Sequence, residues 1–313
     1  MDKKYKEELS RIMGEHLRFD CSLAPYTTFG VGGKADILCE VRNEKELKDL
    51  VSYLYKKCIP YLVVGLGSNL LITDKGIEGV AIRLSGSLAS IQNKNHHTNG
   101  NGRKSAESTV ITVGGGLKIA DLLAHCRSYG LGGVEFLAGI PATVGGAVAM
   151  NAGAFGKEIG SVVQNIHLIT LQGAIVTMDR PQLRFAYRHL DIKPEDIIIR
   201  ASLKLERKDK RDVAGRITDY LRIRNKTQPM GHPTAGSIFK NPPGDYAAKL
   251  IEKVGLKGKR IGGAVISPKH ANFIVNTGDA SANDILSLMN IVREKVKEAT
   301  GIELEPEIRV TGR

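Results

Sequence analysis

An almost wholly apolar strand, YLVV at residues 61–64, runs directly into the loop GLGSN at residues 65–69. Such a strand is typical of a sheet that is covered on both faces. Before it come a predicted strand at residues 35–41 and a predicted helix, which begins with a capping box formed by Asn43 and Glu46. The helix should bury its apolar residues at helical spacing, Leu47, Leu50, Val51 and Leu54. The order strand, helix, strand predicts an α/β unit.

A polar stretch at residues 85–108 has no apolar period and is predicted to be a surface loop or a disordered insertion. It contains His96 and His97, to which we assign no role because no carboxylate or thiol stands at metal-ligand spacing. A second α/β unit is predicted after it. Its elements in chain order are a strand at 110–113, the glycines 114–116, a helix at 117–129 with Gly130 as its C-cap, the glycine-rich run 139–156, and strands near 162–171 and 197–205.

A third unit is predicted after a charged passage at residues 204–216. Its clearest element is a helix at residues 283–300, which begins with a capping box formed by Ser281 and Asp284 and ends at Gly301. The buried stripe of this helix is predicted at Ile285, Leu288, Met289, Val292 and Val296. We therefore expect three domains, which span residues 1–84, 85–212 and 213–313.

The last predicted strand lies in the sequence GIELEPEIRV at residues 301–310. Apolar residues alternate there with Glu303, Glu305, Glu307 and Arg309, so one face of the strand should be buried and the other charged. By periodicity alone the three glutamates are equivalent.

Composition limits the class of protein. A chain of 313 residues is long enough for two or three packed units. Its 45 basic and 33 acidic residues leave a net charge of +12, which suits anionic partners of several kinds. Aromatic residues make up only 5%, tryptophan is absent and the basic residues are scattered, so nucleic-acid binding is disfavoured. Small anionic molecules are the favoured partners.

The cysteines Cys21, Cys39, Cys58 and Cys126 form no C-x-x-C pair and are predicted to be buried thiols in a reducing compartment. Residues 1–19 are interpreted as an amphipathic helix without the apolar core of a signal peptide. No apolar run reaches the ~20 residues that span a bilayer. We expect a cytoplasmic monomer that does not insert into membranes and holds no metal.

Three glycine loops, at residues 65–69, 114–116 and 139–146, are candidates for a phosphate cradle, because glycine lets backbone N–H groups approach an anion. Each loop alone is more often just a turn. Neither a P-loop motif nor a G-x-G-x-x-G that opens a helix is present. The pattern favours a dinucleotide cofactor held between α/β units in some other way.

The chain resembles the UDP-N-acetylenolpyruvoylglucosamine reductase family from residue 27 to residue 312. The motifs that carry the resemblance, in the order typical of the family, are GLGSNLL at 65–71, the run 139–156, Tyr187-Arg188, AGSIFKNP at 235–242, KHANFIVN at 269–276 and PEIR at 306–309. The resemblance implies an α+β fold: two α/β subdomains that bind FAD, of the vanillyl-alcohol oxidase and p-cresol methylhydroxylase type, and a C-terminal α+β domain that binds the UDP-sugar. It implies that NADPH reduces the flavin, which passes hydride to the enolpyruvyl group and gives UDP-N-acetylmuramate for peptidoglycan.

The resemblance also implies the site residues. A hydride added to the enolpyruvyl double bond leaves an enolate, which Arg188 is expected to stabilise, Ser237 to protonate at carbon and Glu307 to polarise through the substrate carboxylate. The implied substrate contacts are Tyr187, Arg224, Lys240 and Asn241. The implied cofactor contacts are Gly65, Gly67, Ser68, Asn69, Leu70, Gly114, Gly139, Ile140, Pro141, Thr143, Gly145, Gly146, Ala147, Asn151 and Gly153.

The sequence departs from the family pattern at two places, and its interval from Arg188 to Ser237 is short. That interval predicts the shorter subtype, which lacks an extra tyrosine-bearing loop. Ala142 stands where glycine is usual, and His189, Leu190 and Asp191 follow Arg188 where a serine is common two places after the arginine. These departures concern contacts rather than the reaction.

Two other hypotheses stay open on the residues alone. The chain could be another flavin oxidase or dehydrogenase of the same cofactor fold. It could also be a basic nucleic-acid-binding or phosphate-binding protein without catalysis. A colourless protein that takes up no FAD would favour the last of these.

Overall fold

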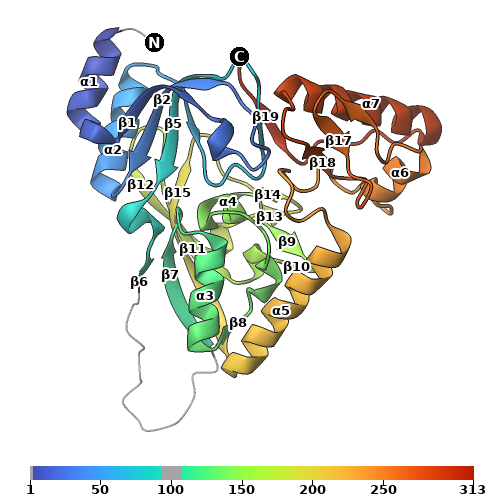
Figure 1. Cartoon of the computed structure of the whole chain (residues 1–313). Helices are drawn as coiled ribbons and strands as arrows, with labels where there is room; N and C mark the ends of the chain where they lie inside the picture. The colour runs from blue at the N-terminus through green and yellow to red at the C-terminus, as the bar shows by residue number, and fades with distance from the viewer. Residues whose placement is uncertain (1–2, 93–107) are drawn as a thin grey trace. The chain divides into compact units, whose positions relative to one another are not determined.

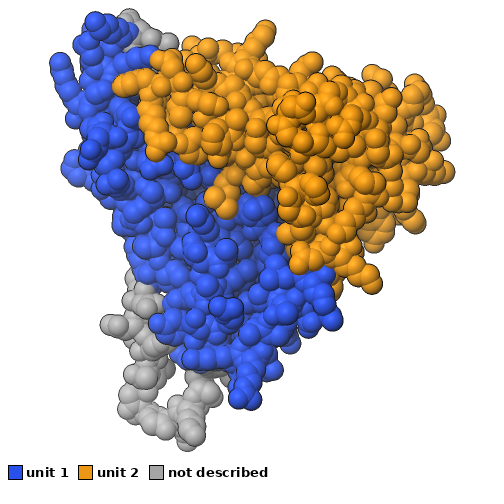
Figure 2. Space-filling model, in the orientation of Figure 1, with its two compact units in different colours: residues 1–17, 39–65, 81–222 blue, residues 18–38, 66–80, 223–313 orange. Residues whose placement is uncertain are grey.

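The computed structural model describes residues 3–92 and 108–313 (Figure 1). His96 and His97 lie outside the described residues, as does most of the polar stretch that contains them. The chain divides into two compact units, which Figure 2 shows in different colours. Unit 1 comprises residues 1–17, 39–65 and 81–222, and unit 2 comprises residues 18–38, 66–80 and 223–313.

The described part of unit 1 contains an antiparallel sheet with the strand order β12-β11-β15-β7-β6, in which β8 also pairs with β15. The long strand β15 occupies the centre and pairs with both β11 and β7. Its bounds and those of its neighbours are β6 Ile91–Gln92, β7 Ser108–Gly114, β8 Leu131–Gly132, β11 Val163–Ile169, β12 Ile175–Asp179 and β15 Ile197–Arg207. The strands predicted near 110–113, 162–171 and 197–205 are therefore confirmed.

A second sheet has the order β1-β2-β5-β3. Its strands are β1 Leu17–Ser22, β2 Lys34–Val41, β3 Tyr61–Val63 and β5 Ile77–Leu84. Between β2 and β3 lies α2, Glu44–Lys56, which buries the four predicted apolar residues. The Asn43 side chain accepts the Glu46 N–H at its N-terminus, and the Glu46 carboxylate accepts the Arg42 N–H. The predicted order strand, helix, strand is confirmed.

The other helices of unit 1 pack against its helices and strands. Helix α1, Lys3–Met13, packs against α2, and the short α4, Val144–Ala149, packs against β15 and β7. Helix α3, Ile119–Tyr129, ends at Gly130 in the left-handed conformation (φ 65°), as predicted. One hydrophobic core extends from Ile111 to Leu205 and includes residues of α3, α4, β7, β11 and β15.

Unit 2 is built around helix α7, Ala282–Thr300, which packs against α6, Ala247–Lys253, and the strand β17. Both bonds of the predicted capping box of Ser281 and Asp284 are present. The helix buries the five predicted apolar residues and ends at the left-handed Gly301. Two small sheets complete the unit: the antiparallel order β16-β17-β18 (Arg260–Ile261, Ala264–Ile266 and Ile274–Asn276) and the parallel pair of β4 and β19 (Leu70–Ile72 and Arg309–Thr311).

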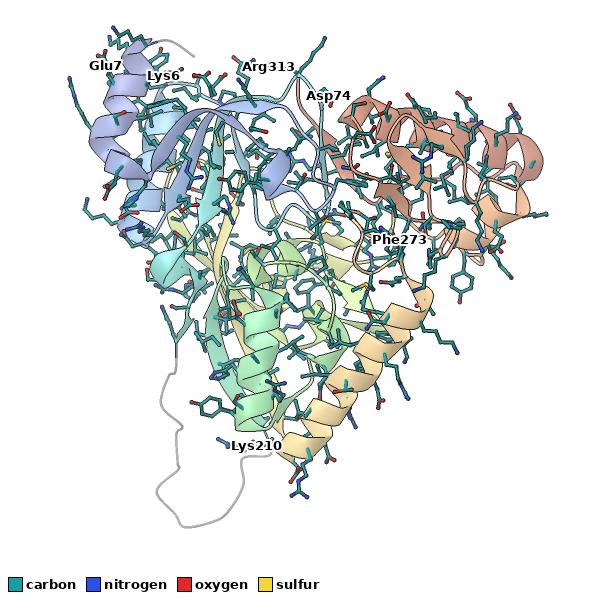
Figure 3. All side chains as sticks on the ribbon, viewed as in Figure 1. Lys6, Glu7, Asp74, Lys210, Phe273 and Arg313 are labelled. Atoms are coloured by element: carbon teal, nitrogen blue, oxygen red, sulfur yellow. The ribbon has the colours of Figure 1, made fainter. Side chains whose placement is uncertain are left out.

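Two further contacts of unit 2 involve Asp74 and the C-terminal residue Arg313. The carboxylate of Asp74, labelled in Figure 3, accepts the N–H groups of Ala282 and Asn283 at 2.8 and 3.0 Å. Arg313, also labelled, forms an ion pair with Asp36 at 2.7 Å. The segment 66–80 is thus anchored to the C-terminal helix.

Several predicted elements are wrong. The strand predicted within residues 301–310 is reduced to β19, and Pro306 makes only an isolated bridge with Phe239, in keeping with the rarity of proline inside strands. Val310, expected on the buried face, is 41% exposed. The N-terminal helix ends at Met13, and β1 begins at Leu17. Helices α4, α6 and α5 (Lys210–Thr227) were not predicted, and residues 86–89 and 91–92 of the polar stretch form a 3-10 turn and a strand.

Candidate active site

The three glycine loops meet in unit 1 around residues 142–146. A Cβ atom at Gly65 would lie 2.6 Å from Oγ1 of Thr143, so a side chain there is excluded. The N–H of Gly145 donates to the carbonyl of Gly115 at 2.8 Å, and the N–H of Val144 donates to Leu117 at 2.8 Å. Three turns that were each weak signals in the sequence are therefore neighbours in the fold.

The glycines at 114–116 permit close packing of backbone on backbone. Their N–H groups donate to the carbonyls of Ser90, Ile199 and Leu88, each at 2.8 Å. A Cβ at Gly115 would lie 2.0 Å from the Ile198 carbonyl oxygen. The requirement for glycine here comes from the strands, and Gly114 as a cofactor contact stays a prediction.

Thr143 begins α4, with its side chain accepting the N–H of Gly146 at 3.4 Å. Immediately before it, the carbonyl of Ala142 accepts the N–H of Ile119 at 2.9 Å. Gly139 is left-handed (φ 78°), whereas Ala142 is not among the residues with positive φ. An alanine is therefore accommodated at the family's usual glycine position without backbone strain.

The loop at residues 65–69 continues into unit 2, where Gly67 has φ 64°. A Cβ there would lie 2.2 Å from the Tyr26 carbonyl oxygen. Asn69 follows, and its side-chain amide donates to the carbonyl of Glu307 at 3.2 Å, while its own carbonyl accepts the N–H of Arg309 at 2.9 Å. The end of this loop is thereby tied to the segment that carries Glu307.

Ser237 and Glu307 lie on neighbouring segments of unit 2. Ser237 pairs in an antiparallel bridge with Phe273, which is labelled in Figure 3, and Phe239 pairs with Pro306. The N–H of Glu307 donates to the carbonyl of Ile238 at 2.7 Å. The segment 237–239 is therefore held between residues 272–273 on one side and 305–307 on the other.

Glu307 differs from the other glutamates of its segment in its surroundings. It is half-buried, whereas Glu303 and Glu305 are exposed. Glu303 is paired with Arg293 and Lys297, and these ion pairs with the attendant hydrogen bonds lower its pKa. The structure thus separates three residues that the periodicity of the sequence left equivalent.

Asn272 holds the Ser237 segment through its side chain as well as its backbone. Its amide accepts the Phe239 N–H at 3.0 Å and donates to the Phe239 carbonyl at 2.8 Å, and its own carbonyl accepts the Ile238 N–H at 2.9 Å. Asn272 is 3% exposed. It lies in the KHANFIVN motif, yet the sequence assigned it no role. A polar amide inside an apolar run was the signal, because buried amides are hydrogen-bonded.

Arg188 sits in unit 1 at the tip of a tight hairpin. Strands β13, Phe185–Ala186, and β14, His189–Leu190, leave only Tyr187 and Arg188 between them. Arg188 has φ 57°, a conformation that glycine or asparagine usually supplies in such a turn. Its guanidinium lies over the Tyr187 ring, 5.0 Å from the centroid. A half-buried arginine in a left-handed turn is typical of a residue held for function.

The two residues after Arg188, where the sequence departs from the family pattern, differ in their surroundings. His189 is exposed at the edge of the hairpin, and Leu190, where a serine is common, is 1% exposed and belongs to the core of unit 1. Leu190 therefore contributes packing where a hydroxyl would give a polar contact.

The predicted substrate contacts have partners within the protein. Lys240 forms an ion pair with Glu305 at 3.0 Å, Asn241 accepts the Ala247 N–H at 3.1 Å, and Arg224 donates to the Gln228 side chain at 3.2 Å. Tyr187 is 46% exposed. Of the predicted catalytic residues, Ser237 and Glu307 are brought together in unit 2, whereas Arg188 belongs to unit 1.

Burial shifts the pKa of two cysteines and of one histidine near the Ser237 segment. Burial raises the pKa of the Cys39 and Cys126 thiols to about 12. All four cysteines are free, but Cys58 is exposed, so the prediction that all are buried is wrong. Burial, helped by Lys257, lowers the pKa of His270. Within residues 3–92 and 108–313 no cluster of metal ligands occurs, and no helix there is long and apolar enough to span a membrane.

Two protein families match the chain. Residues 35–179 match the family described as FAD binding domain, and residues 228–311 match the family described as UDP-N-acetylenolpyruvoylglucosamine reductase, C-terminal domain. The UDP-N-acetylenolpyruvoylglucosamine reductase of Syntrophomonas wolfei is 36% identical over 98% of this chain and 99% of its own length. The chain belongs to the UDP-N-acetylenolpyruvoylglucosamine reductase family.

Other members of the family are similar to this chain over nearly its whole length. The reductase of Bacillus subtilis is 38% identical over 100% of this chain and 99% of its own. The crystal structure of UDP-N-acetylenolpyruvylglucosamine reductase from Thermus caldophilus superposes with a TM-score of 0.79 at 37% identity and covers 94% of this chain. The predicted family, the α+β fold class and the FAD-binding domain are confirmed.

Proposed function

We propose that this protein reduces the enolpyruvyl group of UDP-N-acetylenolpyruvoylglucosamine to give UDP-N-acetylmuramate, with FAD as its cofactor and NADPH as reductant. The observation that carries the proposal is the backbone pairing of the Ser237 segment with the Glu307 segment, at 2.7 Å between Glu307 N and Ile238 O. Through this pairing the motifs at residues 235–242 and 306–309 lie next to each other in unit 2.

FAD would be held by the three glycine loops, at the predicted contacts Gly65, Gly67, Ser68, Asn69, Leu70, Gly114, Gly139, Ile140, Pro141, Thr143, Gly145, Gly146, Ala147 and Gly153. The meeting of these loops at residues 142–146 supports the fit, because the glycines keep bare backbone where side chains would collide. Bound FAD supplies the hydride for the double bond after receiving one from NADPH. The protein contributes the charge and the proton that the substrate then needs.

Arg188 is assigned to the negative charge that develops on the substrate carboxylate, because a guanidinium stays protonated and grips a carboxylate through two N–H groups. Ser237 gives its hydroxyl proton to the carbon of the enolate. Glu307 polarises the carboxylate of the same intermediate. A fixed set of such groups lowers the barrier because it needs no reorganisation when the charge forms.

Tyr187, Arg224, Lys240 and Asn241 are assigned to the UDP-sugar, with the two cations facing the diphosphate. In the same proposal residues 1–84 and 85–212 bind FAD and residues 213–313 bind the substrate, in line with the family matches at 35–179 and 228–311. The four free thiols favour a cytoplasmic location. The monomeric state stays a prediction that sedimentation would test.

NADPH oxidation measured with and without UDP-N-acetylenolpyruvoylglucosamine tests the proposal. We expect a yellow protein that consumes NADPH only when the sugar nucleotide is present. Consumption that ignores the sugar would favour another flavin oxidase or dehydrogenase. A colourless protein that cannot be reconstituted with FAD would overturn the proposal altogether.

A further inference from the structure

The side chain of Asn151 is wholly buried and makes three hydrogen bonds within the protein. It is 0% exposed. Its amide nitrogen donates to the Glu158 carboxylate at 2.7 Å and to the Ala186 carbonyl at 2.9 Å, and its oxygen accepts the Gly160 N–H at 3.0 Å. A primary amide has two hydrogens to donate. Both are given to protein acceptors, so the Asn151 side chain has none left for a cofactor.

These three bonds join the two hairpins that surround Arg188. Ala186 is the last strand residue before the turn that contains Arg188, and it pairs with His189 across that turn. Glu158 ends β10, Lys157–Glu158, which pairs with β9, Gly153–Ala154. A Cβ at Gly153 would lie 3.4 Å from Nη1 of Arg188, so β9 lies directly beside the guanidinium. One amide therefore fixes both the backbone that carries Arg188 and the hairpin beside its charged group.

Asparagine is the side chain that this position requires. Residue 151 is left-handed (φ 42°), a conformation that asparagine tolerates better than most residues. The neighbouring groups demand two donated hydrogen bonds and one accepted. Aspartate has the same shape but no hydrogen to donate, and its charge would face the Glu158 carboxylate. Glycine suits the backbone but removes all three bonds.

We infer that Asn151 is a positioning residue for Arg188: it holds the turn of Tyr187 and Arg188 at the angle that the reaction needs, and its side chain donates no hydrogen bond to the flavin. The inference rests on the proposed role of Arg188. It gives Asn151 a different role from the one that the family resemblance implied, which was a cofactor contact.

The test is a double-mutant cycle with Asn151→Asp and Arg188→Ala, in which two half-reactions are measured by rapid mixing. We expect Arg188→Ala to slow flavin reoxidation by UDP-N-acetylenolpyruvoylglucosamine by ~10²-fold or more, as for other lost electrostatic groups. Asn151→Asp should slow it by ~10- to 100-fold, the cost of a misplaced group. In these variants the flavin content and the rate of flavin reduction by NADPH should stay within about twofold of wild type, because Arg188 takes no part in that step. The double variant should be no slower than Arg188→Ala alone.

Two controls keep the result interpretable. Asn290→Asp changes an exposed asparagine of α7 in the same way and should alter neither half-reaction. Asn151→Gly removes the amide at a backbone that glycine adopts freely, so it tests the inference even where Asn151→Asp does not fold. It should reproduce the slow reoxidation with normal flavin reduction.

The outcomes separate the inference from the function it rests on. A double variant slowed by the product of the two single effects would mean that Asn151 acts independently of Arg188 and would overturn the inference. Loss of flavin, or reoxidation at the wild-type rate in Asn151→Gly, would overturn it too. Wild-type reoxidation in Arg188→Ala would instead overturn the proposed role of Arg188, and the inference with it.

Discussion

The Arg188 hairpin in unit 1 and the Ser237 segment in unit 2 are held by different means. Arg188 occupies a two-residue turn in a left-handed conformation, and the Asn151 side chain donates a hydrogen bond to the carbonyl of Ala186 just before this turn. Ser237 lies in a segment paired through its backbone on both sides, with Phe273 and with the residues around Pro306. The first arrangement combines a strained two-residue turn with a hydrogen bond from one side-chain amide, and the second relies on backbone pairing between segments far apart in sequence.

This difference predicts how substitutions in each region should affect catalysis and stability. A change at the Arg188 hairpin should impair the charge-stabilising group and leave the fold intact, because the strained turn is short. A change that breaks the backbone pairing of the Ser237 segment should also displace Glu307, so catalysis and stability should fall together.

A large effect that sharpens the comparison is expected for Glu307→Gln. If Glu307 polarises the substrate carboxylate, flavin reoxidation should slow by ~10²- to 10³-fold, the usual cost of one such group. Glu303→Gln is the matched control, because Glu303 is exposed on the same segment and paired with Arg293 and Lys297. Rapid-mixing kinetics of both variants decide the point; equal rates in the two would remove Glu307 from the site.

A smaller but specific effect is expected for Asn272→Ala. The change leaves the N–H and carbonyl of the buried Phe239 without their side-chain partner, which should lower the free energy of unfolding by roughly 3 kcal/mol, from 1–3 kcal/mol for each orphaned group. Urea unfolding measures the loss, and hydrogen exchange of residues 236–241 locates it.

Asn241→Ala is the control for that change, because Asn241 is exposed and its side chain accepts one N–H, that of Ala247. It should cost about 1 kcal/mol or less, as an exposed hydrogen bond does. Equal losses in the two variants would show that Asn272 is not the special support of the Ser237 segment.

The smallest effect concerns pH. His270 lies in the turn before Asn272, and burial, then Lys257, lowers its pKa in the folded state. A histidine with a lowered folded pKa favours the folded state fully above its unfolded pKa of ~6.5, and this advantage is lost as the pH falls below that value toward the folded pKa.

The stability of wild type should therefore decrease between pH 7.5 and pH 5.5 more than that of His270→Gln, as urea unfolding at both values would measure. The loss should appear as faster exchange at residues 236–241, not at residues 185–190. A wild-type decrease no larger than that of the variant, or equal changes at both sites, would contradict this assignment.

The parts of the fold that the sequence predicted are those with local causes. The caps at Ser281, Gly130 and Gly301 were predictable because each acts within one helical turn. The apolar stripe of α7 and the central strand β15 were predictable from periodicity and length. The strand at 301–310 was the main error, and Pro306 was the local signal against it.

The site was predictable from motifs and much less from the residues themselves. Periodicity gave no reason to prefer Glu307 over Glu303, because half-burial of Glu307 follows from pairing with a segment about seventy residues earlier. The bonds of Asn272 to Phe239 and of Asn151 to Ala186 likewise join residues 33 and 35 positions apart. A linear pattern carries no information on such partners.

Ser237→Ala tests the central claim most directly. The variant should bind FAD and be reduced by NADPH at the wild-type rate, because the hydroxyl takes no part in that step. Flavin reoxidation by UDP-N-acetylenolpyruvoylglucosamine should slow by ~10²- to 10⁴-fold, the usual contribution of a positioned proton donor. Reoxidation at the wild-type rate would contradict the assignment of Ser237, and with it the account of how unit 2 contributes to the reaction.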